Sequence, residues 1–301
     1  MTNYVTPADA IVRHYTLGYG KIKKLEYDDK LNRKYITILF DDCSEPKMFH
    51  YPEEFITGLL SATDEDTKIV VSYEIDKFNN KKASDNYNEI RKIIMDREIR
   101  YLHHFTQAEN LPSILEHGLV PINKHNEKSI NAVVNDKKRY DGGVHTNLSV
   151  SQLNYYLLQQ FILNRDDNTD WVVINVDSSI LLSTDNQATY CQTNAANRSG
   201  EKGCSASDFQ SMFSETVKYK TDAKGKIVIP RQPGLPKHLT TDIQAEITIS
   251  GIIPPKYIKG VIFQSNGVMD KALKEYGLKK DKRFVVDSNI FEKDYVIPFY
   301  R

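Results

Sequence analysis

Three stretches of the sequence carry polar side chains of the types that catalysis needs. His104 and Thr106 stand two residues apart, and together they can hold a flat polar ligand through hydrogen bonds. Arg139 can clamp a phosphate, because its planar fork of N–H donors matches two oxygens. Glu246, with Gln244 two residues before it, can stabilise positive charge that develops in a transition state. These residue types predict a site that binds a phosphate-bearing ligand and stabilises a cationic transition state.

The first of these stretches, residues 100–119, predicts a short strand, a polar corner and a helix. Alternation along the strand places His104 and Thr106 on one face. Asn110 can cap the helix, because its side-chain oxygen can accept a free N–H of the first turn. Gly118 can adopt the left-handed conformation that ends a helix. The strand therefore presents its His and Thr at the mouth of a turn.

Each candidate also has a structural interpretation. His104 could be a core histidine satisfied by its neighbours, since histidine is often partly buried. Arg139 ends the run Lys137-Lys138-Arg139, which could be a solvated charge run before a glycine turn. Glu246 follows a turn at the start of a strand, where an acid often faces solvent. Against this, period-two alternation predicts that Gln244 and Glu246 share one strand face.

Further elements must position these side chains in the second part of the chain. The polar segment 123–136 is long and irregular, as lids and substrate loops often are. Residues 144–151 are strand-like with polar alternates, 154–163 favour an apolar helix, and 171–176 favour a buried strand. Residues 218–236 are rich in Lys, Gly and Pro and predict an exposed hairpin or loop.

The first 62 residues predict a separate domain. Short β-rich runs with tight turns indicate a small β-barrel that is similar to SH3/Tudor-like barrels. This block holds eight Lys and Arg against nine Asp and Glu, so charge does not favour nucleic-acid binding there. We predict a barrel over 1–62, a linker over 63–83 with an exposed loop at Asn79–Lys82, and a catalytic domain over 84–301.

Composition limits the class of protein. The formal net charge is zero and 40% of the residues are hydrophobic, which is ordinary for a globular protein and argues against a non-specific nucleic-acid coat. The three cysteines are far apart and in no metal-binding spacing, so we expect a reducing compartment, no disulfide framework and no metal. Neither a secretory signal nor an apolar run of membrane-spanning length is evident. The expected location is the cytoplasm, with no membrane association.

The order of the motifs resembles the DarT family of nucleic-acid ADP-ribosyltransferase toxins over residues 97–265. Any single motif is weak, but the ordered set is specific. It comprises Leu102-His103-His104-Phe105-Thr106, Asn110 to Leu119, Arg139-Tyr140-Asp141-Gly142, Ser149-Val150-Ser151, Asn154-Tyr155, Trp171-Val172-Val173, Asn194-Ala195-Ala196, Phe209 to Phe213, Thr241 to Glu246 and Ile253 to Ile258.

The resemblance implies an α+β fold with a mixed, antiparallel-rich split sheet, and an NAD-dependent ADP-ribosyltransferase. It implies Glu246 and Arg139 as catalytic residues and no metal. The NAD-binding set that we predict comprises His104, Thr106, Asn110, Arg139, Tyr155 and Gln244. The implied partners are a single-stranded nucleic acid and an antitoxin or regulator protein, in a toxin–antitoxin or phage-defence system.

Several alternatives stay open at this point. The chain departs from the family in its N-terminal barrel, its segment 123–136 and its insertion 218–236, so RNA is as reasonable a substrate as DNA and the target base is undetermined. An ADP-ribosyltransferase acting on a protein side chain is a second class. An inactive module that recruits a partner is a third, although intact His104, Arg139 and Glu246 argue against it.

Overall fold

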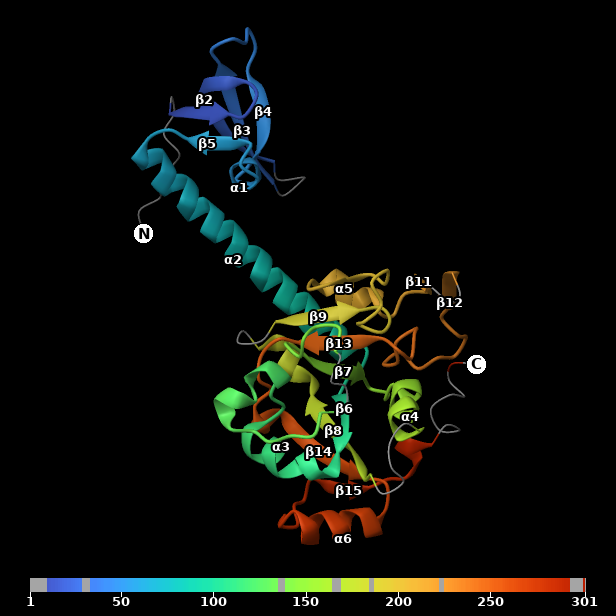
Figure 1. Cartoon of the computed structure of the whole chain (residues 1–301). Coiled ribbons are helices and arrows are strands. Elements are labelled where there is room, and N and C mark those ends of the chain that lie inside the picture. Colours follow the sequence, from blue (N-terminus) through green and yellow to red (C-terminus); the bar gives the residue numbers. More distant parts are fainter. Residues whose placement is uncertain are drawn as a thin grey trace. The chain divides into compact units, whose positions relative to one another are not determined.

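The computed structural model describes residues 10–28, 33–134, 139–163, 169–183, 187–221, 225–292 and 300. It divides into two compact units, Met1–Asp85 and Asn86–Arg301. Figure 1 shows that strands dominate the first unit and that the second combines a large sheet with helices.

The first unit contains an antiparallel sheet of five strands in the order β4-β3-β2-β1-β5. Its inner face buries Val12, Ile22, Ile36, Ile38 and Phe40, which alternate with exposed or half-buried residues as a half-buried sheet requires. The sheet forms a half-barrel, which is partly consistent with the predicted SH3/Tudor-like β-barrel. The elements are β1 (Ile11–His14), β2 (Gly18–Asp28), β3 (Arg33–Phe40), β4 (Lys47–Tyr51), α1 (Glu53–Ile56) and β5 (Leu60–Ala62).

The segment predicted as a linker is helical. Helix α2 runs without interruption over Glu65–Asp96, so the predicted exposed loop at Asn79–Lys82 is wrong. Asp64 provides the start signal, because its carboxylate accepts the N–H of Thr67 at 2.8 Å. The helix contains neither Gly nor Pro. The start signal at Asp64 and this lack of helix-breaking residues outweigh the weak helix propensity of Asn79 and Asn80. The predicted domain limits themselves stay a prediction.

The second unit is built on an eight-stranded sheet in the order β10-β9-β13-β7-β6-β8-β14-β15. Only β14 and β15 run parallel, and the other neighbours are antiparallel, as predicted. The strands are β6 (Tyr101–Gln107), β7 (Thr146–Val150), β8 (Trp171–Asp177), β9 (Ala188–Cys191), β10 (Lys202–Gly203), β13 (Glu246–Ile249), β14 (Ile258–Phe263) and β15 (Phe284–Val286).

Helices and one hairpin complete this unit. The helices are α3 (Leu111–His117), α4 (Tyr155–Leu163), α5 (Ala206–Ser211) and α6 (Asn266–Glu275). The hairpin predicted within the insertion is confirmed as a separate two-stranded sheet of β11 (Thr216–Thr221) and β12 (Gly225–Pro230). No helix in the described part of the chain is long and apolar enough to cross a membrane.

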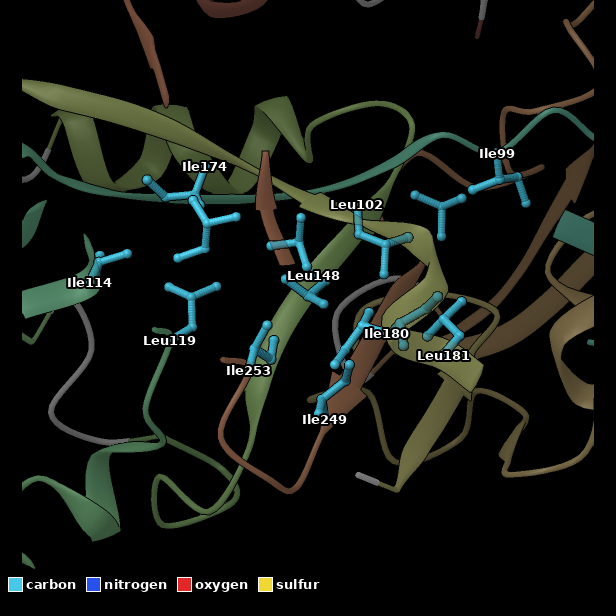
Figure 2. Close-up of a cluster of buried hydrophobic side chains, with 14 of the residues drawn as sticks. Ile99, Leu102, Ile114, Leu119, Leu148, Ile174, Ile180, Leu181, Ile249 and Ile253 are labelled. Carbon is cyan, nitrogen blue, oxygen red and sulfur yellow. The ribbon is translucent and has the colours of Figure 1, made fainter. Parts of the chain in front are cut away.

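One large apolar core fixes the sheet. Figure 2 shows its branched side chains gathered from β6, β7, β8 and β13 and from the segments around α3. Leu102, Leu148 and Ile174 are at most 1% exposed. Such dense packing of aliphatic side chains makes the sheet a rigid support for polar groups at its surface. The α+β class predicted from the sequence is confirmed. The labelled core residues are Ile99, Leu102, Ile114, Leu119, Leu148, Ile174, Ile180, Leu181, Ile249 and Ile253.

Candidate active site

The sheet splits between β6 and β7, and the candidate site lies at the split. Within the described residues, β6 and β7 pair only at Leu102↔Val150 and His103↔Ser149. By contrast, β6 pairs with β8 along its whole length, and β7 pairs with β13 from Thr146 to Ser149. Beyond His103 the two strands therefore diverge. A cavity lined by residues of both strands occupies this place.

The split explains how residues from both sheet faces reach one cavity. His103, Ser149 and Glu246 are directly opposite one another in register, so they share one face. His104 and Thr106 lie one and three residues after His103 on β6, so their side chains point to the opposite sheet face. All five nevertheless line the same cavity. In a continuous sheet, the backbone would separate these two groups.

His104 is held as a neutral hydrogen-bonding group. Its Nδ1 lies 3.0 Å from the backbone carbonyl oxygen of Asn147. Because a carbonyl only accepts, Nδ1 carries the proton and Nε2 is left with an acceptor lone pair. Burial lowers the pKa of His104, and the charge of Arg139 lowers it further against the effect of this hydrogen bond. His104 is therefore a neutral imidazole that offers an acceptor.

Asn110 occupies the predicted N-cap position of α3, but its side chain makes no cap hydrogen bond, so the predicted capping contact is wrong. Its Nδ2 donates to the Thr106 hydroxyl at 2.9 Å and to the Val133 carbonyl at 3.0 Å. Its Oδ1 accepts the Val133 N–H at 2.8 Å. The Asn110 amide thus fastens the cavity-lining segment around Val133 to the end of β6. The rest of the predicted lid, Asn135 and Asp136, lies outside the described residues.

Arg139 is a fixed part of the site, which excludes its interpretation as one more solvated charge. Its Nε and Nη2 donate to the two carboxylate oxygens of Asp141 at 2.9 and 3.0 Å. Nη2 also donates to the His145 carbonyl at 3.0 Å and to Asn147 Oδ1 at 2.7 Å. Burial acts against ionisation of Asp141, but the guanidinium and the N–H of Gly143 hold its pKa well below the usual range. Asp141 therefore neutralises and orients Arg139.

Glu246 is buried, so its solvent-facing interpretation is wrong. It is the first residue of β13, only 3% exposed, and lines the cavity. Its Oε2 accepts the Ala195 N–H at 2.8 Å and Asn147 Nδ2 at 3.3 Å. Burial raises the pKa of Glu246 to about 7, against the lowering effect of these two bonds and of Arg139. A carboxyl poised near neutral pH is a strong candidate for acid–base work.

Asn147 connects these groups and was not recognised from the sequence. Its carbonyl holds His104, its Oδ1 accepts from Arg139, and its Nδ2 donates to Glu246. The polar alternation His145, Asn147 and Ser149 was the available signal, since all three line the cavity. Asp141 and the Ala195 N–H were missed in the same way. Sequence spacing shows a polar face but not the partners that it meets.

Two predicted site residues lie elsewhere. Gln244 is in the turn before β13, so the alternation that would place it beside Glu246 does not apply, and it does not line the cavity. Tyr155 is the first residue of α4, where its ring contacts Tyr156, and it does not line the cavity either. By contrast, His104, Thr106, Asn110, Arg139 and Glu246 come together there. In the described part of the chain, no three His, Cys, Asp or Glu side chains are grouped so as to hold a metal ion.

Comparison with known proteins gives one family. The sequence model described as "DarT: ssDNA thymidine ADP-ribosyltransferase, DarT" matches residues 103–291. No curated protein matches the chain. Among solved structures, Thermosipho africanus DarTG in complex with ADP-ribose is 19% identical with a TM-score of 0.41; the match covers 64% of this chain and 51% of that one. The chain thus spans about half the length of that protein.

Two structures from Thermus sp. 2.9 are also similar. DarT in complex with NAD+ is 12% identical with a TM-score of 0.43, and the match covers 65% of this chain and 98% of that chain. DarT in complex with ADP-ribosylated ssDNA is 12% identical with a TM-score of 0.40, and the match covers 65% and 97%. The family match includes His104, Arg139 and Glu246.

Proposed function

From the premise that the chain belongs to the DarT family, we propose that it transfers ADP-ribose from NAD to a thymine base of single-stranded DNA. The observation that carries this proposal is the buried Glu246, joined through Asn147 to Arg139 and His104 at the split of the sheet. A carboxyl, a guanidinium and a neutral imidazole in one cavity match the three parts of NAD that must be handled. These parts are the reacting ribose, the pyrophosphate and the flat polar rings.

The chemical step determines what each side chain does. The bond between ribose C1′ and the nicotinamide nitrogen breaks, nicotinamide leaves with the bonding electron pair, and positive charge develops on the ribose. Glu246 stabilises this charge in the transition state more than in the ground state. Arg139 holds the pyrophosphate through donors that its contacts with Asp141 leave over. His104 and Thr106 orient the riboside by hydrogen bonds.

The acceptor must lose a proton as it attacks C1′. N1 of thymidine is already bonded to deoxyribose, so N3 is the ring nitrogen that carries a hydrogen. A new C1′–N3 bond therefore requires a base for the N3 proton. Glu246 suits this task, because burial raises its pKa to about 7 and a general base works best near the operating pH. A single strand is the favoured substrate, because its bases need little unstacking.

The decisive experiment is mass spectrometry of oligonucleotides incubated with the protein and NAD. The probes are matched 15-mers of single-stranded DNA with and without thymine, a single-stranded RNA, and a purified protein mixture. We expect an ADP-ribose adduct on the thymine-containing DNA alone. Modification of RNA, or of protein without modification of DNA, would overturn the substrate assignment. An inactive protein that still binds partners would show no adduct in any arm.

The biological setting is part of the same proposal. DNA and NAD are both present in the cytoplasm, and we place the enzyme there. Uncontrolled modification of DNA is toxic, so a neutralising antitoxin or regulator is required, as in toxin–antitoxin or phage-defence systems. We assign docking of that protein to the first unit. Several apolar side chains are exposed on it, among them Tyr15, Tyr19, Tyr27 and Met48.

A further inference from the structure

The hairpin β11–β12 carries three lysines on one face, which they share with the exposed Val228 opposite Lys218. Val217 and Tyr219 point to one face, where Val217 is fully buried. Lys218 and Lys220 alternate with them and point to the other face, together with Lys226, which lies directly opposite Lys220. All three lysines are exposed. Residues 222–224, between the strands, add one Asp and one Lys and leave the net charge unchanged.

The lysine face has no internal charge partner in the described residues. Neither Lys218, Lys220 nor Lys226 forms an ion pair there. Like charges directly opposite on a two-stranded sheet repel, so the pair Lys220↔Lys226 costs the isolated hairpin stability. An anion bound across this face would relieve that repulsion. A chain of regularly spaced phosphates would do so at several lysines at once.

The hairpin is fastened to the loop that holds the catalytic carboxyl. Asn197 Nδ2 and the Ser199 hydroxyl donate to the Lys220 carbonyl at 3.2 and 2.9 Å, and the Ser199 hydroxyl also accepts the Lys220 N–H. Two residues earlier, the Ala195 N–H holds Glu246. The loop therefore connects the backbone of the hairpin to a residue that holds Glu246, and Arg198 in the same loop is exposed.

We propose that the lysine face of β11–β12 (Lys218, Lys220 and Lys226) binds the sugar–phosphate backbone of the single-stranded DNA substrate beside the base that enters the cavity. This inference rests on the proposed function and names where its substrate strand runs. The contacts are electrostatic and sequence-independent, because they reach phosphates and not base edges. They act on strands long enough to extend from the cavity to the hairpin.

The test uses the full chain and compares Lys218→Gln/Lys220→Gln/Lys226→Gln with Lys279→Gln/Lys280→Gln/Lys282→Gln. The control triple removes the same charge from exposed lysines just before β15, an edge strand of the eight-stranded sheet, of which the hairpin is not a part. Fluorescence anisotropy with an unmodified 15-mer gives affinity against salt concentration, independently of transfer. Each lost phosphate contact lowers the logarithmic salt slope by about 0.7, so three contacts lower it by about 2. Transfer to a thymine-containing trinucleotide should be unchanged.

The outcomes separate this inference from the proposed function. A reduced salt slope in the hairpin triple alone, with an unchanged or higher melting temperature, supports the inference whether or not transfer occurs. Wild-type protein that binds the 15-mer but never modifies it contradicts the proposed function only. An unchanged slope in the hairpin triple overturns the inference, as does an equal change in the control triple. Selective loss of binding to an acidic protein, with DNA binding intact, also overturns it.

Discussion

The fold shifts the pKa values of two carboxyl groups near Arg139, those of Asp141 and Glu246, in opposite directions. Asp141 receives a two-point contact from the guanidinium and the N–H groups of Gly143 and His145, and its pKa lies well below the usual range. Glu246 reaches Arg139 only through the amide of Asn147, and burial raises its pKa to about 7. The charge of the arginine is therefore neutralised by Asp141, which allows Glu246 to remain both buried and titratable.

The largest effect is expected from removing the charge of Glu246, the carboxyl whose pKa is raised. Glu246→Gln keeps the shape of the side chain, so we expect an intact fold by circular dichroism. Transfer should fall about a hundredfold or more, as when a charge-stabilising group is lost. The mass-spectrometric assay for the oligonucleotide adduct measures this. Near-normal transfer by a folded Glu246→Gln protein would remove Glu246 from the catalytic role.

The same variant has a pH-dependent effect on stability. The pKa of Glu246 is about 7 when folded against an ordinary 4.5, so between these values the folded state binds more protons than the unfolded state. Wild-type stability must therefore fall as pH rises through this window, by about 3 kcal/mol. Glu246→Gln lacks this loss and should be the more stable protein at pH 8. Thermal unfolding at pH 4.5 and 8 provides the comparison.

Arg139→Lys should produce the next largest loss. The ammonium of lysine keeps the charge. It cannot contact the two carboxylate oxygens of Asp141 and the Oδ1 of Asn147 at the same time, as the guanidinium does. We expect transfer to fall between about 10-fold and 100-fold, the equivalent of one charge-assisted hydrogen bond. Isothermal calorimetry with NAD and initial-rate kinetics would measure it. Wild-type values of both for Arg139→Ala would show that Arg139 has a structural role only and does not contact NAD.

Asn147→Ala sharpens the comparison, because it removes the link between the guanidinium and Glu246. The Asn147 amide bonds to the Arg139 guanidinium and to the Glu246 carboxyl, and the loss of one hydrogen bond to a charged group predicts a decrease in kcat of about tenfold. The carbonyl that holds His104 is retained, so KM for NAD should change little. Without its amide donor, the pKa of Glu246 rises, and the acidic limb of the pH profile should move to higher pH.

The control for this variant is Thr248→Val, which alters the residue opposite Asn147 on the same sheet face. The other charged or titratable groups near Glu246 are Arg139, Tyr140, Cys191 and Asp242, and both variants leave them in place. A shift of the pH profile in Thr248→Val as large as in Asn147→Ala would show that Asn147 acts only through packing.

The smallest effect is expected from the first unit. Removing residues 1–62 leaves α2 and all of the site residues in place. Transfer to a short oligonucleotide should stay within about twofold of the full chain, while neutralisation by the cognate antitoxin is lost. If the shortened and folded protein loses oligonucleotide modification at low salt, the unit takes part in substrate binding and the docking assignment is wrong.

Local sequence signals were enough to locate β6, the start of α3 at Asn110 and the strand of Glu246. Alternation and turn residues act over a few positions, and the core enforces the same periodicity. In α2, the β-branched residues Ile69 to Val71 have a local preference for a strand. The start at Asp64 and the lack of helix breakers prevailed. Local propensity is a weak signal where start and stop signals disagree with it.

Long-range partners could not be predicted. Asn110 has the right type and place for a capping residue, yet its amide binds Val133, 23 residues further along the chain. Asn147 meets Glu246 across 99 residues. A side-chain type shows what a group can donate or accept, but only the fold shows which donor arrives. The resemblance to a family supplied Arg139 and Glu246, and it could not supply the residues that tune them.

The short pairing between β6 and β7 also has a mechanical consequence. It divides the sheet into two four-stranded leaves, β10-β9-β13-β7 and β6-β8-β14-β15, joined in the described residues by two residue pairs. Resistance to separation grows with the number of ladder hydrogen bonds, so this seam is the softest line in the sheet. Local opening of the sheet should occur mainly at this seam, and amide hydrogen exchange in the sheet should be fastest in β6 and β7 on its two sides. A ligand that spans the leaves would act as a clamp and slow that exchange on both sides.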